Sequence, residues 1–171
     1  IAIIETTDQY TGLDWRTYEH RHISHVNVRH LERIRLGTSY LAVVERLRQI
    51  VNSRELAGRC TLVMDATGLG GPVLDLLRAA GLGCEIIPVT ITGGDREIYS
   101  SGMWRVPKRD LINRLQLLFE RKELQIASRL REAETLAREL MNMRVKVSSA
   151  GHDSYAAGRE NVHDDLVLAV A

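Results

Sequence analysis

The chain has 171 residues, of which 44% are hydrophobic and 26% are charged, and its formal net charge is +1 at pH 7. These values are typical of one globular domain with a sizeable core, and they exclude a protein that is basic over its whole surface. No apolar run approaches the roughly 18 residues that span a membrane, and no segment resembles a signal peptide. We therefore expect no membrane partner. Cys60 and Cys84 have neither metal-site spacing nor disulfide density, which fits an intracellular protein.

The first 35 residues predict an extended, partly cationic region. Residues 1–7 predict a strand, residues 8–14 a turn, and residues 15–28 one or two further strands. Residues 15–35 contain five arginines and only two acids. A solvated strand face is the favoured interpretation of this charge, and a local phosphate-contacting surface is the alternative.

An amphipathic helix is predicted over residues 38–57. Its apolar residues recur at steps of three and four, and Thr38 or Ser39 is suited to cap its start. Gly58 is suited to end it.

A βαβ unit follows over residues 60–89. The apolar residues 62–64 predict a strand that is buried on both faces, residues 73–80 a helix, and residues 83–89 a second, parallel strand. Asp65 stands where the first strand ends, and ligands of open α/β sheets bind beyond the carboxyl ends of strands. Asp65 is thus a candidate site residue, and a helix-capping role without chemistry is the alternative.

The remaining elements are assigned from the same patterns. We expect a polar, glycine-rich loop over 90–106, a helix over 107–121, an extended piece over 124–127, a helix over 129–143 capped by Ser128, a strand over 144–147, a polar loop over 148–159 and a helix from 163 to 171.

Two adjacent acids, Asp164 and Asp165, open that last helix. Acids are favoured at a helix start by the helix dipole, so capping alone is one interpretation. Residues 166–171 are wholly apolar, however, and carboxylates at the mouth of a buried helix need a positive partner. Oxygen ligands from Asp65 and these acids suit Mg²⁺ or Mn²⁺. His163 is suited to orient a water, a phosphate or one of the acids, or to act as a local cap.

Three segments together resemble the nuclease domain of the large terminase subunit of tailed phages and prophages. They are Asp-Ala-Thr-Gly-Leu-Gly-Gly-Pro (65–72), Pro-Lys-Arg-Asp-Leu (107–111) and His-Asp-Asp-Leu-Val-Leu-Ala-Val-Ala (163–171). The resemblance implies an RNase H-like α/β fold, with a mixed sheet flanked by helices on both faces. It implies an endonuclease that hydrolyses double-stranded DNA during genome packaging with two divalent metal ions, Mg²⁺ or Mn²⁺. Asp65, Asp165 and Asp164 match the family's catalytic metal ligands.

The resemblance also implies partners. These are a terminase ATPase domain, the small terminase subunit and the portal, in the cytoplasm of a bacterial host. We expect residues 1–171 to form one nuclease domain that lacks the family's first strand and its acid, because residues 1–7 match the second strand. No phosphate-binding motif of an ATPase occurs in the chain.

Three cations flank the predicted active edge. Lys108, Arg109 and Arg96 are candidate DNA contacts, although solvated surface charge is the favoured interpretation of each.

The sequence also fits three other functions. A resolvase or transposase-like nuclease would use the same acids. A nucleotide-binding module would use residues 67–71 to hold phosphate, but it leaves Asp164 and Asp165 without a role. A catalytically inactive packaging or interaction domain would fit the missing first acid.

Overall fold

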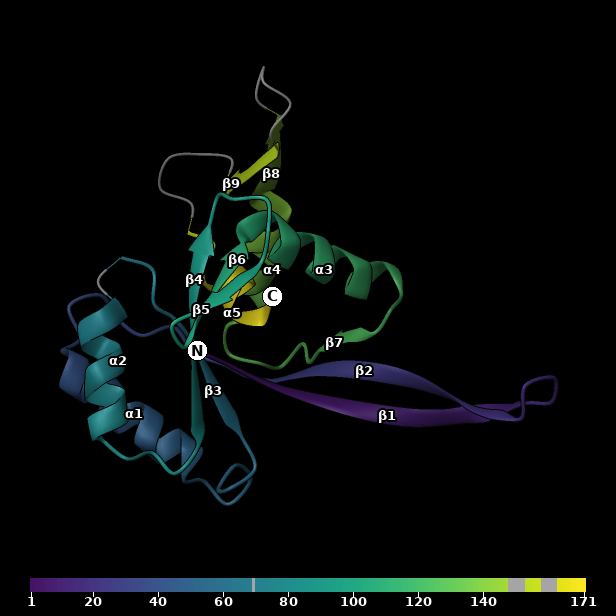
Figure 1. The fold of residues 1–171 in the computed structure, drawn as a ribbon, viewed down its shortest axis with the longest axis horizontal. Helices are drawn as coiled ribbons and strands as arrows, with labels where there is room; N and C mark the ends of the chain where they lie inside the picture. Colours follow the sequence, from purple (N-terminus) through teal and green to yellow (C-terminus); the bar gives the residue numbers. More distant parts are fainter. Residues whose placement is uncertain (69, 148–152, 158–162) are drawn as a thin grey trace. The chain divides into compact units, whose positions relative to one another are not determined.

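The computed structural model describes residues 1–68, 70–147, 153–157 and 163–171 (Figure 1). The chain forms two compact units, which we call unit 1 (Ile1–Arg33 with Arg109–Ala171) and unit 2 (Ile34–Lys108). The elements in chain order are β1 (Ala2–Asp14), β2 (Glu19–Leu31), α1 (Tyr40–Val51), β3 (Thr61–Asp65), α2 (Gly70–Ala79), β4 (Glu85–Thr92), β5 (Ile98–Ser100), β6 (Met103–Pro107), α3 (Lys108–Glu120), β7 (Leu124–Ile126), α4 (Ala133–Asn142), β8 (Met143–Val147), β9 (Asp153–Ala157) and α5 (Asp165–Val170). Among the described residues, no helix has both the length and the apolar character needed to cross a bilayer.

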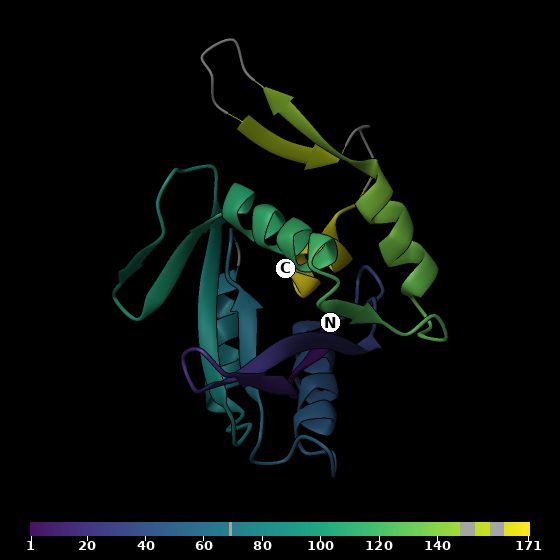
Figure 2. The same cartoon turned by 90° about the vertical axis from the view of Figure 1, so that its right-hand side faces the viewer.

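Unit 1 contains a mixed three-stranded sheet and three helices. The sheet has the order β1-β2-β7, with β1 antiparallel and β7 parallel to β2. The yellow helix α5 lies beside α4 and α3 (Figures 1 and 2). The core of the unit consists of buried aliphatic side chains from β2 and these helices: Val28, Leu31, Ile112, Leu115, Leu136, Leu166, Val167 and Val170. In the helix predicted at residues 163–171, Leu166, Val167 and Val170 are therefore buried, as expected, while Ala169 is exposed.

The β1–β2 hairpin corrects the turn that was predicted at residues 8–14. Those residues continue β1, and the turn lies at residues 15–18 instead. The pairing shifts by one residue between Tyr10 and Gly12, and Gly12 has a φ of 144°. Gly12 thus accommodates a β-bulge within β1. Bulges, like turns, are common positions for glycine.

Unit 2 contains the predicted βαβ unit. β3 and β4 are parallel and paired from Thr61–Glu85 to Asp65–Val89, with α2 between them in sequence. The full sheet has the order β3-β4-β6-β5, in which β6 is parallel to β4 and β5 is antiparallel to β6. Helices α1 and α2 contact each other and bury Val44, Leu47, Val51, Leu74 and Leu77.

The prediction that β3 is buried on both faces is wrong. Its residues alternate between exposed and half-buried, and Val63 is 62% exposed. Among the described residues β3 pairs only with β4, so it is an edge strand. An apolar run indicates that a strand can be buried, but both faces are buried only where other elements cover them. The sequence does not show which elements lie beside the strand.

The prediction of a continuous loop over residues 90–106 is wrong for most of that segment, and only residues 93–97 and 101–102 lie outside strands. β4 continues to Thr92, and β5 and β6 form an antiparallel hairpin at the edge of the sheet (Figure 2). The hairpin turns at Ser101 and Gly102, both of which have positive φ, at 53° and 76°. Two central residues with positive φ make the tight turn that suits a hairpin. The Ser-Gly pair was the available sequence signal for this turn.

The helix boundaries agree with the sequence at some ends and not at others. Ser39 caps α1, as predicted, and its hydroxyl accepts a hydrogen bond from the Ala42 amide at 3.3 Å. α1 ends at Val51, well before Gly58, because Asn52 closes it. α4 begins at Ala133 with Glu132 as its N-cap residue, so Ser128 is not the cap.

The last predicted loop is partly a strand. Residues 153–157 form β9, which pairs antiparallel with β8. The rest of the loop expected at 148–159 lies outside the described residues.

The two free cysteines precede adjacent parallel strands, Cys60 before β3 and Cys84 before β4. Burial raises the pKa of the Cys84 thiol, and the neighbouring Cys60 raises it further. Because the thiolate is the reactive form, we expect N-ethylmaleimide to alkylate Cys84 more slowly at pH 7 in the native protein than in urea. Peptide mass spectrometry would measure both rates, and equal rates would contradict the expectation.

Candidate active site

Asp65 ends β3 and its side chain is exposed. Its Oδ1 accepts hydrogen bonds from the Thr67 amide, at 2.9 Å, and from the Thr67 hydroxyl. A carboxylate that accepts from the amide two residues later forms a local turn, which fixes the orientation of the carboxyl group. No hydrogen bond reaches Oδ2 from any residue that the structure describes. Oδ2 is therefore available as an oxygen ligand for a cation.

Thr67 ties this turn to the neighbouring strand. The hydroxyl oxygen of Thr67 accepts a hydrogen bond from the Ile91 amide at 2.9 Å, and the Ala66 amide donates to the Val89 carbonyl at 2.7 Å. Gly68 follows with a φ of 67°, which allows the chain to turn toward α2. The Asp65 carboxylate is thus held by β4 through Thr67, on the sheet rather than on a free loop.

The second group of predicted site residues lies at the start of α5. The exposed Asp165 is the first residue of the helix, and its Oδ2 is 3.7 Å from His163 Nδ1 and 3.7 Å from Arg33 Nη2. Asp164 occupies the N-cap position, but its side chain makes no capping hydrogen bond. His163 therefore contacts one of the acids, which is one of the arrangements the sequence allowed. The capping role considered for Asp164 is not observed.

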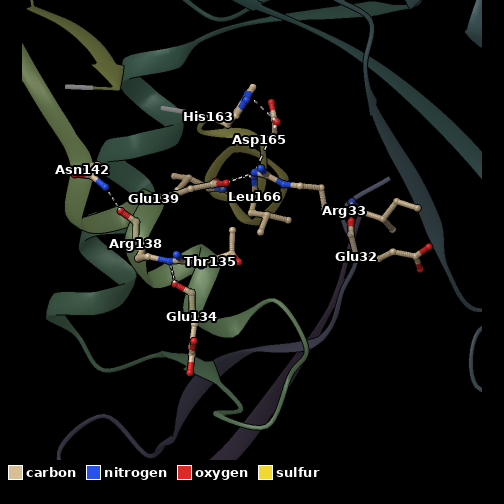
Figure 3. A network of polar contacts seen from close by, with 12 residues as sticks. Glu32, Arg33, Glu134, Thr135, Arg138, Glu139, Asn142, His163, Asp165 and Leu166 are labelled. Carbon is tan, nitrogen blue, oxygen red and sulfur yellow. Dashed lines mark hydrogen bonds and ion pairs between the residues drawn. The ribbon is translucent and has the colours of Figure 1, made fainter. Parts of the chain in front are cut away.

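Glu139 caps α5 instead, and sequence reasoning missed it. Its carboxylate Oε2 accepts from the amides of Leu166 and Val167, at 2.9 and 3.2 Å, and its Oε1 pairs with Arg33 (Figure 3). Glu139 is 5% exposed. A signal was present in the sequence, because Glu139 lies three residues after the inward-facing Leu136 and so shares its face of the helix.

The candidate DNA contacts lie around the start of α3 and before β5. Arg96 is exposed between β4 and β5. Lys108 and Arg109 are the first two residues of α3, and Arg109 Nε is 3.5 Å from Asp110 Oδ1.

The structure brings His163 to Asp165 at the start of α5, within unit 1, whereas Asp65 belongs to unit 2. Within the described ranges, no set of three or more histidine, cysteine or acidic side chains is close enough to hold a metal ion. Each group offers oxygen donors, which are the ligands that hard cations such as Mg²⁺ and Mn²⁺ prefer.

Among known proteins, similarity to this chain was found by comparing structures and not by comparing sequences. No protein-family model and no curated protein matches the sequence. The chain is similar to the large terminase nuclease of the thermophilic phage G20c, with a TM-score of 0.62 and 22% identity over 99% of this chain and 79% of that one. A structure of the same nuclease with bound magnesium gives a TM-score of 0.60 and 23% identity, over 99% and 78% of the two chains.

The large terminase nuclease domain of Thermus phage P74-26 gives a TM-score of 0.57 and 21% identity, over 99% and 76% of the chains. At such identities the likeness concerns the fold. The chain therefore has the α/β, RNase H-like fold of these domains, with mixed sheets flanked by helices, as the sequence predicted.

Proposed function

We propose that the chain is the nuclease domain of a large terminase subunit and hydrolyses the phosphodiesters of double-stranded DNA during phage or prophage genome packaging. The observation that carries the proposal is the RNase H-like fold, shared over 99% of the chain with terminase nucleases, together with carboxylates at the end of β3 and the start of α5. Fold alone does not determine function, so the acids are needed for the argument.

Asp65, Asp165 and Asp164 would hold the catalytic ions, which we propose to be two Mg²⁺ or Mn²⁺ ions. The Oδ2 of Asp65, which accepts no hydrogen bond from the described part of the chain, and the exposed carboxylate of Asp165 are suitable donors for such ions. One of the similar terminase nucleases contains bound magnesium, which supports this choice of metal. When bound, two such ions activate a water molecule and stabilise the leaving oxygen of a phosphodiester.

The other polar residues would orient these acids and the DNA. Thr67 fixes the Asp65 carboxylate through two hydrogen bonds, and His163 contacts Asp165. We propose that Lys108, Arg109 and Arg96 contact DNA phosphates, since each is a cation at the start of α3 or in the loop before β5.

The proposal includes a further strand beside β3. β3 is the edge strand of its sheet within the described residues, and Val63 on it is 62% exposed. Apolar edge strands with free backbone groups favour pairing with another strand. The family's first strand, with the acid that the resemblance implies for it, would cover this edge. The ATPase domain, the small terminase subunit and the portal are the proposed partners, in the cytoplasm of the bacterial host.

We expect the full-length protein that carries this chain to nick supercoiled plasmid DNA in Mn²⁺ or Mg²⁺ but not in EDTA. Agarose gels would follow the loss of the supercoiled form, and adding excess metal to the EDTA sample should restore cleavage. Cleavage that persists in EDTA would contradict the metal-dependent mechanism. A folded, metal-supplied protein that leaves the plasmid intact would favour an inactive packaging or interaction domain instead.

A further inference from the structure

Glu139 is a buried acid whose position needs a physical reason. Burying a carboxylate is costly unless hydrogen bonds and opposite charge compensate for the lost water. Glu139 is 5% exposed and receives both kinds of compensation: two backbone amides donate to Oε2, and the Arg33 guanidinium pairs with Oε1 (Figure 3). All of these partners belong to unit 1.

The amides belong to the first turn of α5, where backbone donors lack partners within the helix. Asp164, at the N-cap position, supplies no side-chain hydrogen bond to them. Glu139 supplies the acceptor from α4, so the start of α5 is fixed by a residue far away in the sequence. Asp165 is carried by that same turn, and the placement of its backbone therefore depends on Glu139.

Arg33 connects Glu139 to Asp165. The guanidinium pairs closely with Glu139, while its Nη2 is 3.7 Å from Asp165 Oδ2, at the longer end of an ion pair. The side chain of Arg33 is 33% exposed and that of Asp165 is 68% exposed. Any cation that binds Asp165 must compete with this guanidinium, and Glu139 draws the guanidinium away.

We infer that Glu139 is a positioning residue for Asp165: it fixes the first turn of α5 and holds the Arg33 guanidinium, which leaves the Asp165 carboxylate accessible to a divalent cation. The inference rests on the proposed function in one respect, namely that Asp165 binds such a cation. Glu139 itself is not a ligand of the ion and does not contact the DNA.

The Glu139→Gln variant separates the two actions of the carboxylate. Gln keeps an oxygen that can accept from the α5 amides but has no charge to hold Arg33. The guanidinium then pairs more strongly with Asp165, and Mn²⁺ must displace it. We expect the Mn²⁺ concentration at half-saturation, measured by isothermal titration calorimetry, to rise about fivefold, because an ion pair at a partly exposed site changes affinity by that order.

The double variant Arg33→Gln/Glu139→Gln removes the competing cation as well. We expect its half-saturation concentration to return to within about twofold of the wild-type value, because contacting residues act non-additively. A residue with a purely structural role would show no such recovery. Glu134→Gln is the matched control, since Glu134 is an exposed acid on the same helix, and it should leave the concentration unchanged.

Circular dichroism would establish that each variant is folded. If Glu139→Gln does not fold, Glu139→Asp tests the same point, because the shorter side chain cannot reach both the amides and Arg33, and it should also raise the concentration. If the folded Glu139 variant binds Mn²⁺ as the wild type does, or if the double variant shows no recovery, the inference is overturned and the proposed function is unaffected. Absence of Mn²⁺ binding in the wild-type protein overturns the metal-dependent function, and the inference with it.

Discussion

Replacing Asp65 with Asn is expected to lower metal-dependent DNA cleavage by about 10²-fold or more, because it removes one charge from a proposed metal ligand. The Asn oxygen can still accept the hydrogen bonds that Thr67 donates to Oδ1, so the turn after β3 should persist. Plasmid nicking rates in Mn²⁺ would measure the loss, and far-UV circular dichroism would confirm the fold.

Asp75→Asn is the matched control for this variant. Asp75 is an exposed acid on α2, in the same unit as Asp65, and it has no place in the proposed site. We expect it to cleave at the wild-type rate. Undiminished cleavage by folded Asp65→Asn protein would refute the catalytic role and leave Asp65 as the acid that forms the turn to α2.

Replacing Leu136 with Ala is expected to lower the free energy of unfolding by about 2–5 kcal/mol, the usual cost of a cavity left by a buried leucine. Leu136 is fully buried on α4 and belongs to the core of unit 1 together with Leu166 and Val167 of α5. The cavity should therefore also weaken the packing of α5, the helix that begins at Asp165. Urea unfolding followed by circular dichroism would measure it, provided that the slope of the transition is unchanged.

Leu117→Ala serves as the comparison for this core substitution. Leu117 lies on α3 in the same unit and is 41% exposed, so its truncation leaves little cavity. We expect a change of about 0.5 kcal/mol or less. Equal losses for the two variants would show that Leu136 is less important to the core than its burial indicates.

Patterns within a few residues of one another correctly predicted several elements. The spacing of apolar residues predicted α1 and α3, and Ser39, one of the two residues predicted to cap α1, is its cap. The strand–helix–strand order predicted the parallel pairing of β3 with β4 and the placement of Asp65 at the end of β3. The apolar run after Asp165 predicted a buried helix. In each case the predictive pattern lies within one contiguous segment of the chain, so it can be recognised in the sequence alone.

What depends on distant residues came only from the tertiary structure. The sequence did not reveal that β3 is an edge strand, because exposure depends on which strands lie beside it. It placed acids at the start of α5 but could not identify what satisfies the helix amides. That acceptor is Glu139, 27 residues before Leu166 in sequence, and Arg33 is a further 106 residues before Glu139. Residues so far apart in the sequence meet only because the core packs. Local propensity and spacing therefore determined the helices and strands, whereas the tertiary structure decided which charges surround Asp165.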